Sequence, residues 1–138
     1  MRKFMKTAAC LILVIVLFML GSCNKKATIE LVQDEGKSYF CDFNIVDNSV
    51  HIVCKITLSN NSSGDVTVKL NALMYDDVKN GLLAQAAIPG VDLESKESVF
   101  FIPAKAESTF DVDFVGELGD STVKVDRTLP QVEITIIE

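Results

Sequence analysis

From residue 38 onward, hydrophobic and polar residues mostly alternate, which is the two-residue period of a β-strand with one buried face. Turn-forming residues interrupt the alternation about every ten residues, a spacing typical of all-β sandwiches. We therefore predict an antiparallel β-sandwich of about seven strands. The strands are expected at residues 39–46, 50–58, 66–75, 82–88, 98–102, 107–115 and 132–136, with a helical turn as the alternative at 82–88 and an uncertain eighth strand around Leu31.

The expected breaks between strands follow from residue type. Asn60 to Asp65 is rich in Asn, Ser and Gly, which favour loops, and Asp76 to Gly81 has the composition of a turn. Pro89-Gly90 is expected to end the segment 82–88, because proline lacks a backbone donor and glycine weakens a strand.

The first two strands predict a hairpin with a defined register. Asp47 and Asn48 both tolerate positive φ, so they suit a two-residue turn. That turn places Cys41 directly across from Cys54, in a non-hydrogen-bonded pair with Cα atoms about 4.5–5.5 Å apart, within reach of a disulfide. We therefore predict a Cys41–Cys54 disulfide. Two free thiols that fill the core are the alternative, and two cysteines without further ligands do not make a zinc site.

The N-terminus has the three parts of an export signal. Arg2, Lys3 and Lys6 precede a short apolar stretch, and small residues follow it. Leu20-Gly21-Ser22-Cys23 resembles the bacterial lipobox, in which a branched residue and two small residues precede a cysteine. The resemblance implies cleavage between Ser22 and Cys23 and a diacylglyceryl group on the Cys23 thiol. The alternatives are an uncleaved membrane helix and an ordinary cleaved signal.

This interpretation divides the chain into three parts and sets its location. Residues 1–22 are a lipoprotein signal peptide, 23–37 are the lipidated cysteine and a tether, and 38–138 are the β-sandwich domain. Paired acyl chains anchor a protein stably, whereas a single chain does so only weakly. We therefore expect a cell-envelope protein that is held on a bacterial membrane through Cys23 and faces away from the cytoplasm.

The net charge argues against nucleic acid as a partner. The whole chain carries −6, and removing residues 1–22, with three positive charges and no negative one, changes this to −9. Such a surface repels phosphates, and no cluster of Lys or Arg offsets it. Tryptophan is absent, so no aromatic platform for sugars or bases is evident.

Three local patterns resemble the small immunoglobulin-like domains of exported bacterial lipoproteins, of the FxLYD type. They are the Asn-rich segment Asn60-Asn61-Ser62, the segment Ala72-Leu73-Met74-Tyr75-Asp76 and the proline-led turn from Ile102 to Phe110. Ala72 and Met74 stand where that family has Phe and Leu. The resemblance implies an immunoglobulin-like sandwich that serves as a binding or spacer module, with no catalytic residues to transfer.

The residues themselves offer little chemistry. His51 is the only histidine, expected on a polar face opposite Asn44, and Ser49 nearby lies in a turn, so a Ser-His-Asp arrangement is not expected. Calcium takes six or more oxygen ligands. The acidic candidates for such a site are Asp76, Asp77, Asp111 and Asp113, with Asn80 beside the first pair, but ordinary solvated carboxylates are the preferred interpretation.

Two functional hypotheses emerge. The leading one is a non-catalytic binding or envelope-accessory module with no metal or cofactor, attached to the membrane and in contact with an unidentified protein. The alternative is an inhibitor of an extracellular protease that presents the loop from Pro89 to Glu97. An enzyme is not expected, because the sequence contains no phosphate-binding loop, redox Cys-x-x-Cys motif or nucleotide fingerprint.

Overall fold

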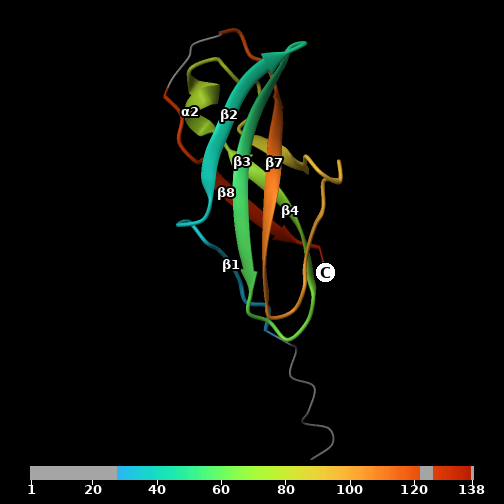
Figure 1. The fold of residues 1–138 in the computed structure, drawn as a ribbon. Coiled ribbons are helices and arrows are strands. Elements are labelled where there is room, and N and C mark those ends of the chain that lie inside the picture. Colours follow the sequence, from blue (N-terminus) through green and yellow to red (C-terminus); the bar gives the residue numbers. More distant parts are fainter. Residues whose placement is uncertain (1–27, 122–125, 138) are drawn as a thin grey trace, which may run out of the picture.

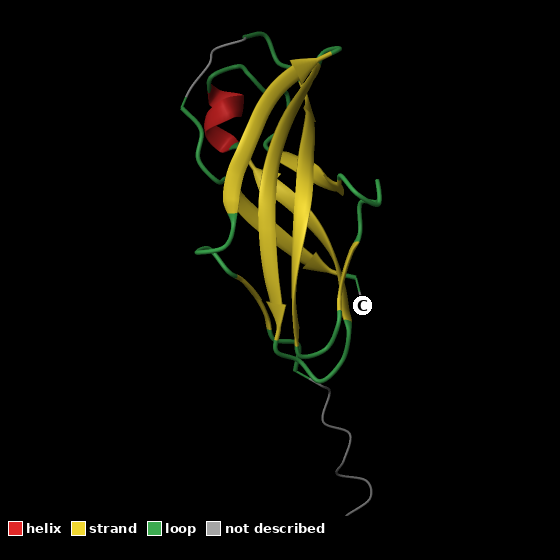
Figure 2. Ribbon diagram, viewed as in Figure 1, coloured by secondary structure: helices red, strands yellow, loops and turns green. Residues whose placement is uncertain are grey.

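The computed structural model of the chain describes residues 28–121 and 126–137. This part is nearly all β, as predicted, with eight strands and one short helix (Figure 2). The elements are β1 (Leu31–Gln33), β2 (Tyr39–Val46), β3 (Ser49–Asn60), β4 (Val66–Leu73), α2 (Tyr75–Lys79), β5 (Ala87–Asp92), β6 (Phe100–Ile102), β7 (Ala106–Glu117) and β8 (Gln131–Ile136).

The strands form two antiparallel layers, which confirms the prediction of an all-β, sandwich-like fold (Figure 1). In one layer, β1 and β2 both pair with β3, which pairs along its whole length with β7. In the other, β4 pairs with β8, β5 and β6. The uncertain strand around Leu31 is present as β1, so the folded part begins within the segment predicted as a tether.

Strand β5 joins the two layers, and here the sequence prediction is wrong. Pro89-Gly90 does not end a strand: residues 87–89 pair with β4, and residues 90–92 continue to pair with β7. Gly90 permits the crossing, because a Cβ atom there would lie 2.7 Å from Cγ1 of Val112 and 2.9 Å from Cε1 of Phe114. Side chains of the neighbouring strand β7 thus occupy the space that any larger residue at position 90 would need, which explains the glycine.

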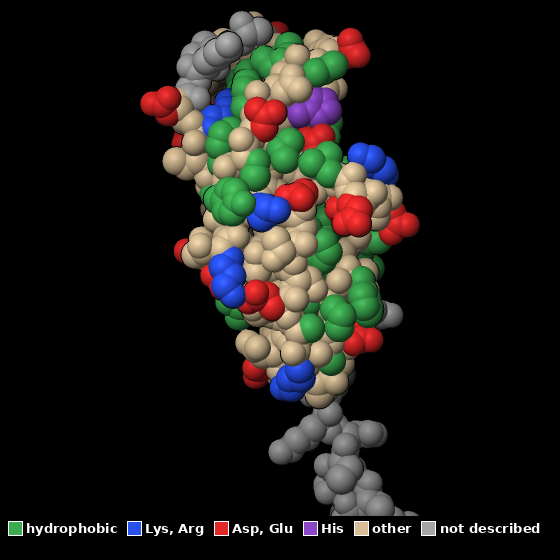
Figure 3. All heavy atoms as spheres, in the orientation of Figure 1, with side chains coloured by type: hydrophobic (Ala, Val, Ile, Leu, Met, Phe, Trp, Pro, Cys, Tyr) green, Lys and Arg blue, Asp and Glu red, His purple; other side chains and the backbone are tan. Residues whose placement is uncertain are grey.

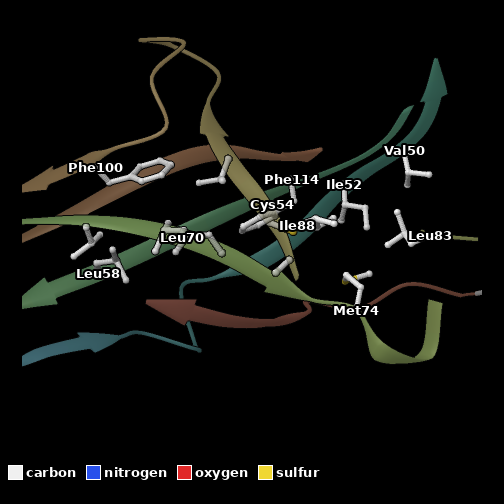
Figure 4. Packing of buried hydrophobic residues seen from close by; sticks show 14 of the residues in the cluster. Val50, Ile52, Cys54, Leu58, Leu70, Met74, Leu83, Ile88, Phe100 and Phe114 are labelled. Atoms are coloured by element: carbon white, nitrogen blue, oxygen red, sulfur yellow. The ribbon is translucent and has the colours of Figure 1, made fainter. Parts of the chain in front are cut away.

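Alternate hydrophobic positions of β3 and β4 form the core between the layers, whereas Tyr39 and Cys41 of β2, which the alternation placed on the apolar face, are exposed. Val50, Ile52, Ile56 and Leu58 of β3 are at most 1% exposed, and they face the buried residues of β4. Figure 4 shows this packing, with Phe100 and Phe114 among the largest fully buried side chains. The rings of Phe100 and Phe110 meet edge to face, 5.1 Å between centroids.

The segment after β4 also differs from its prediction. The expected turn at 76–81 contains helix α2, and the expected strand or helical turn at 82–88 contributes one isolated bridge, from Leu83 to Leu118, before β5 begins. Leu82 and Leu83 are buried, and their amides donate to the carbonyl of Asp77. This segment therefore closes one end of the sandwich as a cap instead of extending a sheet.

Candidate functional site

The outer face of β3 and β7 carries polar side chains that pair across the two strands. The pairs across the strands are Lys55–Asp111 at 2.7 Å and Thr57–Thr109 at 2.9 Å, and Lys37, from the loop before β2, pairs with Glu107 of β7 at 2.9 Å. Hydrogen bonds to the two acids raise the pKa values of Lys37 and Lys55. Lys/Arg and Asp/Glu side chains are mixed over the face shown in Figure 3. Exposed ion pairs of this kind contribute little to stability, so the charged part of the face is a solvated surface with matched charges, whereas Thr57 is buried.

His51 belongs to the same face and pairs with Asp113. Its Nδ1 atom lies 2.8 Å from Oδ2 of Asp113, and the two side chains are 28% and 15% exposed. The predicted register opposite Asn44 is confirmed. A nucleophile would have to contact the histidine ring for triad chemistry, but no described hydrogen bond joins Ser49 to His51. The other oxygen of Asp113, Oδ1, is buried without a partner in the described part of the chain.

A second charged pair lies beside α2 and was not predicted. Arg127 donates two hydrogen bonds to Asp77, from Nη1 to Oδ2 at 3.0 Å and from Nη2 to Oδ1 at 2.9 Å. The side chains are only 9% and 11% exposed, and the guanidinium lies 4.2 Å from the ring centroid of Phe43. Arg127 is the only arginine after the predicted cleavage site, which was the one sequence signal for a special role.

These contacts account for three of the four acids considered as calcium ligands, all except Asp76. Asp77 binds Arg127, Asp111 binds Lys55 and Asp113 binds His51, so the carboxylates are distributed over three separate pairs. Within residues 28–121 and 126–137, no group of three or more His, Cys, Asp or Glu side chains is arranged to hold a metal ion.

A hollow of about 450 Å³ lies between α2 and residues 126–131, and Asp77 and Arg127 form part of its wall. Its size falls in the range of small-ligand sites. Unlike most such sites it is open and lined largely by polar groups. These include Tyr75, Asp76, Asn80, Asp126, Thr128 and Gln131. The Nε atom of Arg127 is buried and has no hydrogen-bond partner in the described structure. Helix α2, which lines the hollow, lies at the end of the domain opposite the loops after β3 and β6 (Figure 1).

The two cysteines are not opposite each other. Strand β2 follows the predicted register from Val46 to Asp42, but a β-bulge then shifts it by one residue, so Phe40 instead of Cys41 lies across from Cys54. Cys41 is exposed, Cys54 is buried in the core, and both are free thiols in the structure. Burial, followed by the effect of Cys41, raises the pKa of Cys54 to about 12. The register on which the disulfide prediction rested is therefore wrong at this pair.

The accessibility of the two thiols gives a direct test. In the native protein without reductant, we expect a maleimide to label Cys41 rapidly and Cys54 only after unfolding, because Cys54 is buried and stays protonated. Mass spectrometry of the labelled protein counts the adducts. Cys41→Ser should remove the rapid phase alone. If neither cysteine takes up label until the protein is reduced, the result would instead support the Cys41–Cys54 disulfide.

The Asn-rich segment that contributed to the family resemblance has a structural role. Asn60 is 1% exposed, and its Nδ2 atom lies within 2.9–3.2 Å of the carbonyl oxygens of Gly64, Ile102 and Pro103. Its Oδ1 atom accepts a hydrogen bond from the amide of Ser62 at 3.0 Å. Asn60 thus joins the loop after β3 to the turn before β7.

The loop proposed for a protease inhibitor is shorter than predicted. Its first four residues, from Pro89 to Asp92, belong to β5, and Asp92 organises the turn after this strand. The Oδ1 and Oδ2 atoms of Asp92 accept hydrogen bonds from the amide of Glu94 and the hydroxyl of Ser95, at 3.0 and 3.1 Å. Lys96 adopts a φ of +64°. The exposed part is a tight turn that is bonded to itself.

Comparisons with known protein families, with curated proteins and with solved structures found no match to this chain. No helix in the described residues is both long and apolar enough to cross a membrane. The predicted signal, the cleavage site and Cys23 lie outside the described residues.

Proposed function

We propose that this protein is a lipoprotein of the bacterial cell envelope, anchored through Cys23, whose domain is a non-catalytic binding or accessory module. The observation that carries the proposal is the lipobox-like sequence Leu20-Gly21-Ser22-Cys23 at the end of an apolar stretch with a basic start. The proposed FxLYD-type relationship agrees with a domain of this kind.

The position of the folded domain suits such an anchor. Strand β1 begins at the same end of the domain as the loops after β3 and β6, because Leu31 pairs with Asn60 (Figure 1). The amide of Glu30 donates to Oγ of Ser62 at 2.6 Å, and the amide of Asn61 donates to the carbonyl of Glu30 at 2.8 Å, which fixes the start of β1. Eight residues from Cys23 to Leu31 span at most about 29 Å. A lipid on Cys23 would therefore hold this end of the domain close to the membrane surface.

The polar contacts support a binding role over catalysis. A catalytic centre needs a nucleophile, acid or base aimed at a substrate position. The most prominent polar groups of the described domain instead bond to one another: His51 to Asp113, Lys55 to Asp111, and Arg127 to Asp77.

The anchor is tested by two matched cysteine variants. In a bacterial host, Cys23→Ser should abolish incorporation of labelled fatty acid and leave the leader uncleaved, because only Cys23 follows the small residues of the motif and the implied cleavage follows its lipidation. Cys10→Ser lies within the same leader and should leave lipidation unchanged. The measurement is lipid labelling with mass spectrometry of the mature N-terminus. A wild-type protein with an unmodified Cys23 or an intact leader would disprove the proposal.

A further inference from the structure

Three apolar side chains are exposed on the outer face of the β4 layer. Phe101 of β6 lies opposite Thr67 of β4, and the amide of Ile137, just after β8, donates to the carbonyl of Thr67 at 2.8 Å. Phe101 is 55% exposed, Ile137 is 40% exposed, and Val99, two residues before Phe101, is 37% exposed. Phe101, Ile137 and Val99 together form the apolar patch.

The apolar patch differs from the central strands of the other layer, whose exposed apolar side chains Val32, Tyr39 and Val46 lie on the flanking strands β1 and β2. There, the outward positions of β3 and β7 bear paired charges and threonines, such as Lys55 with Asp111. Phe101 lies between Phe100 and Ile102, which are both buried in the core. These two residues supply the core contacts of β6, so packing of the core does not explain the exposed ring of Phe101. Large apolar side chains that gather on a surface mark a contact with a partner or a membrane.

The position of the apolar patch indicates which of these it meets. β4 begins at Val66, directly after the loop whose Ser62 holds Glu30, so the patch lies in the half of the domain nearest the proposed anchor. The chain from Cys23 to Leu31 reaches at most about 29 Å, so Leu31 stays within that distance of the lipidated cysteine and this half of the domain can reach the membrane surface. Lys69 is exposed on the same strand face as Thr67, where it can meet anionic headgroups.

We propose that the apolar patch rests in the interfacial region of the membrane and so fixes the orientation of the domain. This rests on the proposed lipid anchor, which brings the patch within reach of the lipids. Phe101 inserts its ring among the headgroups, and Ile137 and Val99 pack beside it. The hollow next to α2, at the other end of the domain, then faces away from the membrane and stays accessible.

The absence of tryptophan in this chain allows a clean test. Phe101→Trp places a single fluorophore in the apolar patch. Tyr75→Trp is the matched control, because Tyr75 is an exposed aromatic residue (65%) in α2, at the opposite end. Both variants are made as full-length lipoproteins and reconstituted into phosphatidylglycerol–phosphatidylcholine vesicles with or without bromine on the acyl chains. Mass spectrometry and vesicle flotation first confirm that each protein is lipidated and bound.

For Phe101→Trp, we expect the Trp emission of the vesicle-bound protein to lie at shorter wavelength than that of the unlipidated chain in buffer without detergent. Brominated lipid should reduce the intensity of this emission by about two-fold or more. Tyr75→Trp should show neither change. If both proteins float and Trp emission in Phe101→Trp is unquenched, the membrane contact is wrong while the anchor stands. A blue shift without quenching identifies a protein surface over the patch and likewise overturns the proposal. If neither protein is lipidated or floats, the anchor itself fails.

Discussion

Asn60→Asp is expected to destabilise the domain by about 3–6 kcal/mol at neutral pH, a large share of the stability of a small domain. The Nδ2 group of Asn60 donates to carbonyl oxygens of the loop after β3 and of the turn before β7. A carboxylate of the same shape places an acceptor oxygen against these carbonyls, and burial at 1% exposure leaves no water to separate them.

The pH dependence of this effect has a definite sign. Repulsion by the three carbonyls and burial raise the pKa of the introduced carboxyl in the folded state above its unfolded value of about 3.9. The unfolded chain therefore loses its proton first, and the destabilisation of Asn60→Asp grows as the pH rises above about 4. Urea denaturation followed by circular dichroism at acidic and neutral pH measures this difference.

Asn61→Asp is the control, because Asn61 is adjacent and exposed, and no described hydrogen bond involves its side chain. The same change of charge there should alter the free energy of unfolding by no more than about 0.5 kcal/mol. Equal effects of the two substitutions would mean that the added negative charge matters and the buried hydrogen bonds of Asn60 do not.

Asp77→Asn is expected to cost about 3–5 kcal/mol of stability, because it leaves the Arg127 guanidinium nearly buried and without its counter-charge. The amide can accept only through its single oxygen, so the two-point contact with Nη1 and Nη2 is lost. The positive charge of Arg127 then remains packed over the ring of Phe43 in β2 without a carboxylate to balance it. Thermal and urea unfolding measure the loss.

Asp76→Asn is the matched control for this prediction. Both aspartates lie in the first turn of α2, so both substitutions remove the same favourable interaction with the helix N-terminus, worth at most about 1 kcal/mol. Only Asp77 contacts Arg127. A double variant, Asp77→Asn with Arg127→Met, should be less destabilised than the sum of its parts. Similar effects of Asp76→Asn and Asp77→Asn would contradict a dominant role for the ion pair.

The register of the first hairpin shows how far residue patterns extend. Asp47 and Asn48 adopt φ values of +47° and +66°, as their residue types suggested, and the pairing follows the prediction as far as Asp42 and Val53. The bulge beyond this point depends on how Phe40 and Phe43 both reach the core from an edge strand. Strict alternation puts Phe40 and Phe43 on opposite faces of the strand, so it does not predict the bulge, and the position of Cys41 was predicted wrongly.

Local chemistry likewise set the positions of most strands but not their partners. The alternation in β3, β4 and β7 placed the correct side chains in the core, because each strand has one buried face whatever its neighbours are. The course of β5 through Pro89-Gly90 depends on how closely the side chains of Val112 and Phe114 in β7 pack over Gly90, which a single segment does not reveal.

The sequence by itself determined the all-β class, the inward faces of the main strands and the turn at Asp47-Asn48, because these depend on neighbouring residues and on the period of the strand. The tertiary structure decided the pairing of Arg127 with Asp77, the burial of Asn60 and the opposite exposures of Cys41 and Cys54. These features join residues 4 to 50 positions apart in the chain, or depend on a one-residue shift at a sheet edge. Such contacts arise only when the layers close on each other, so no local pattern contains them.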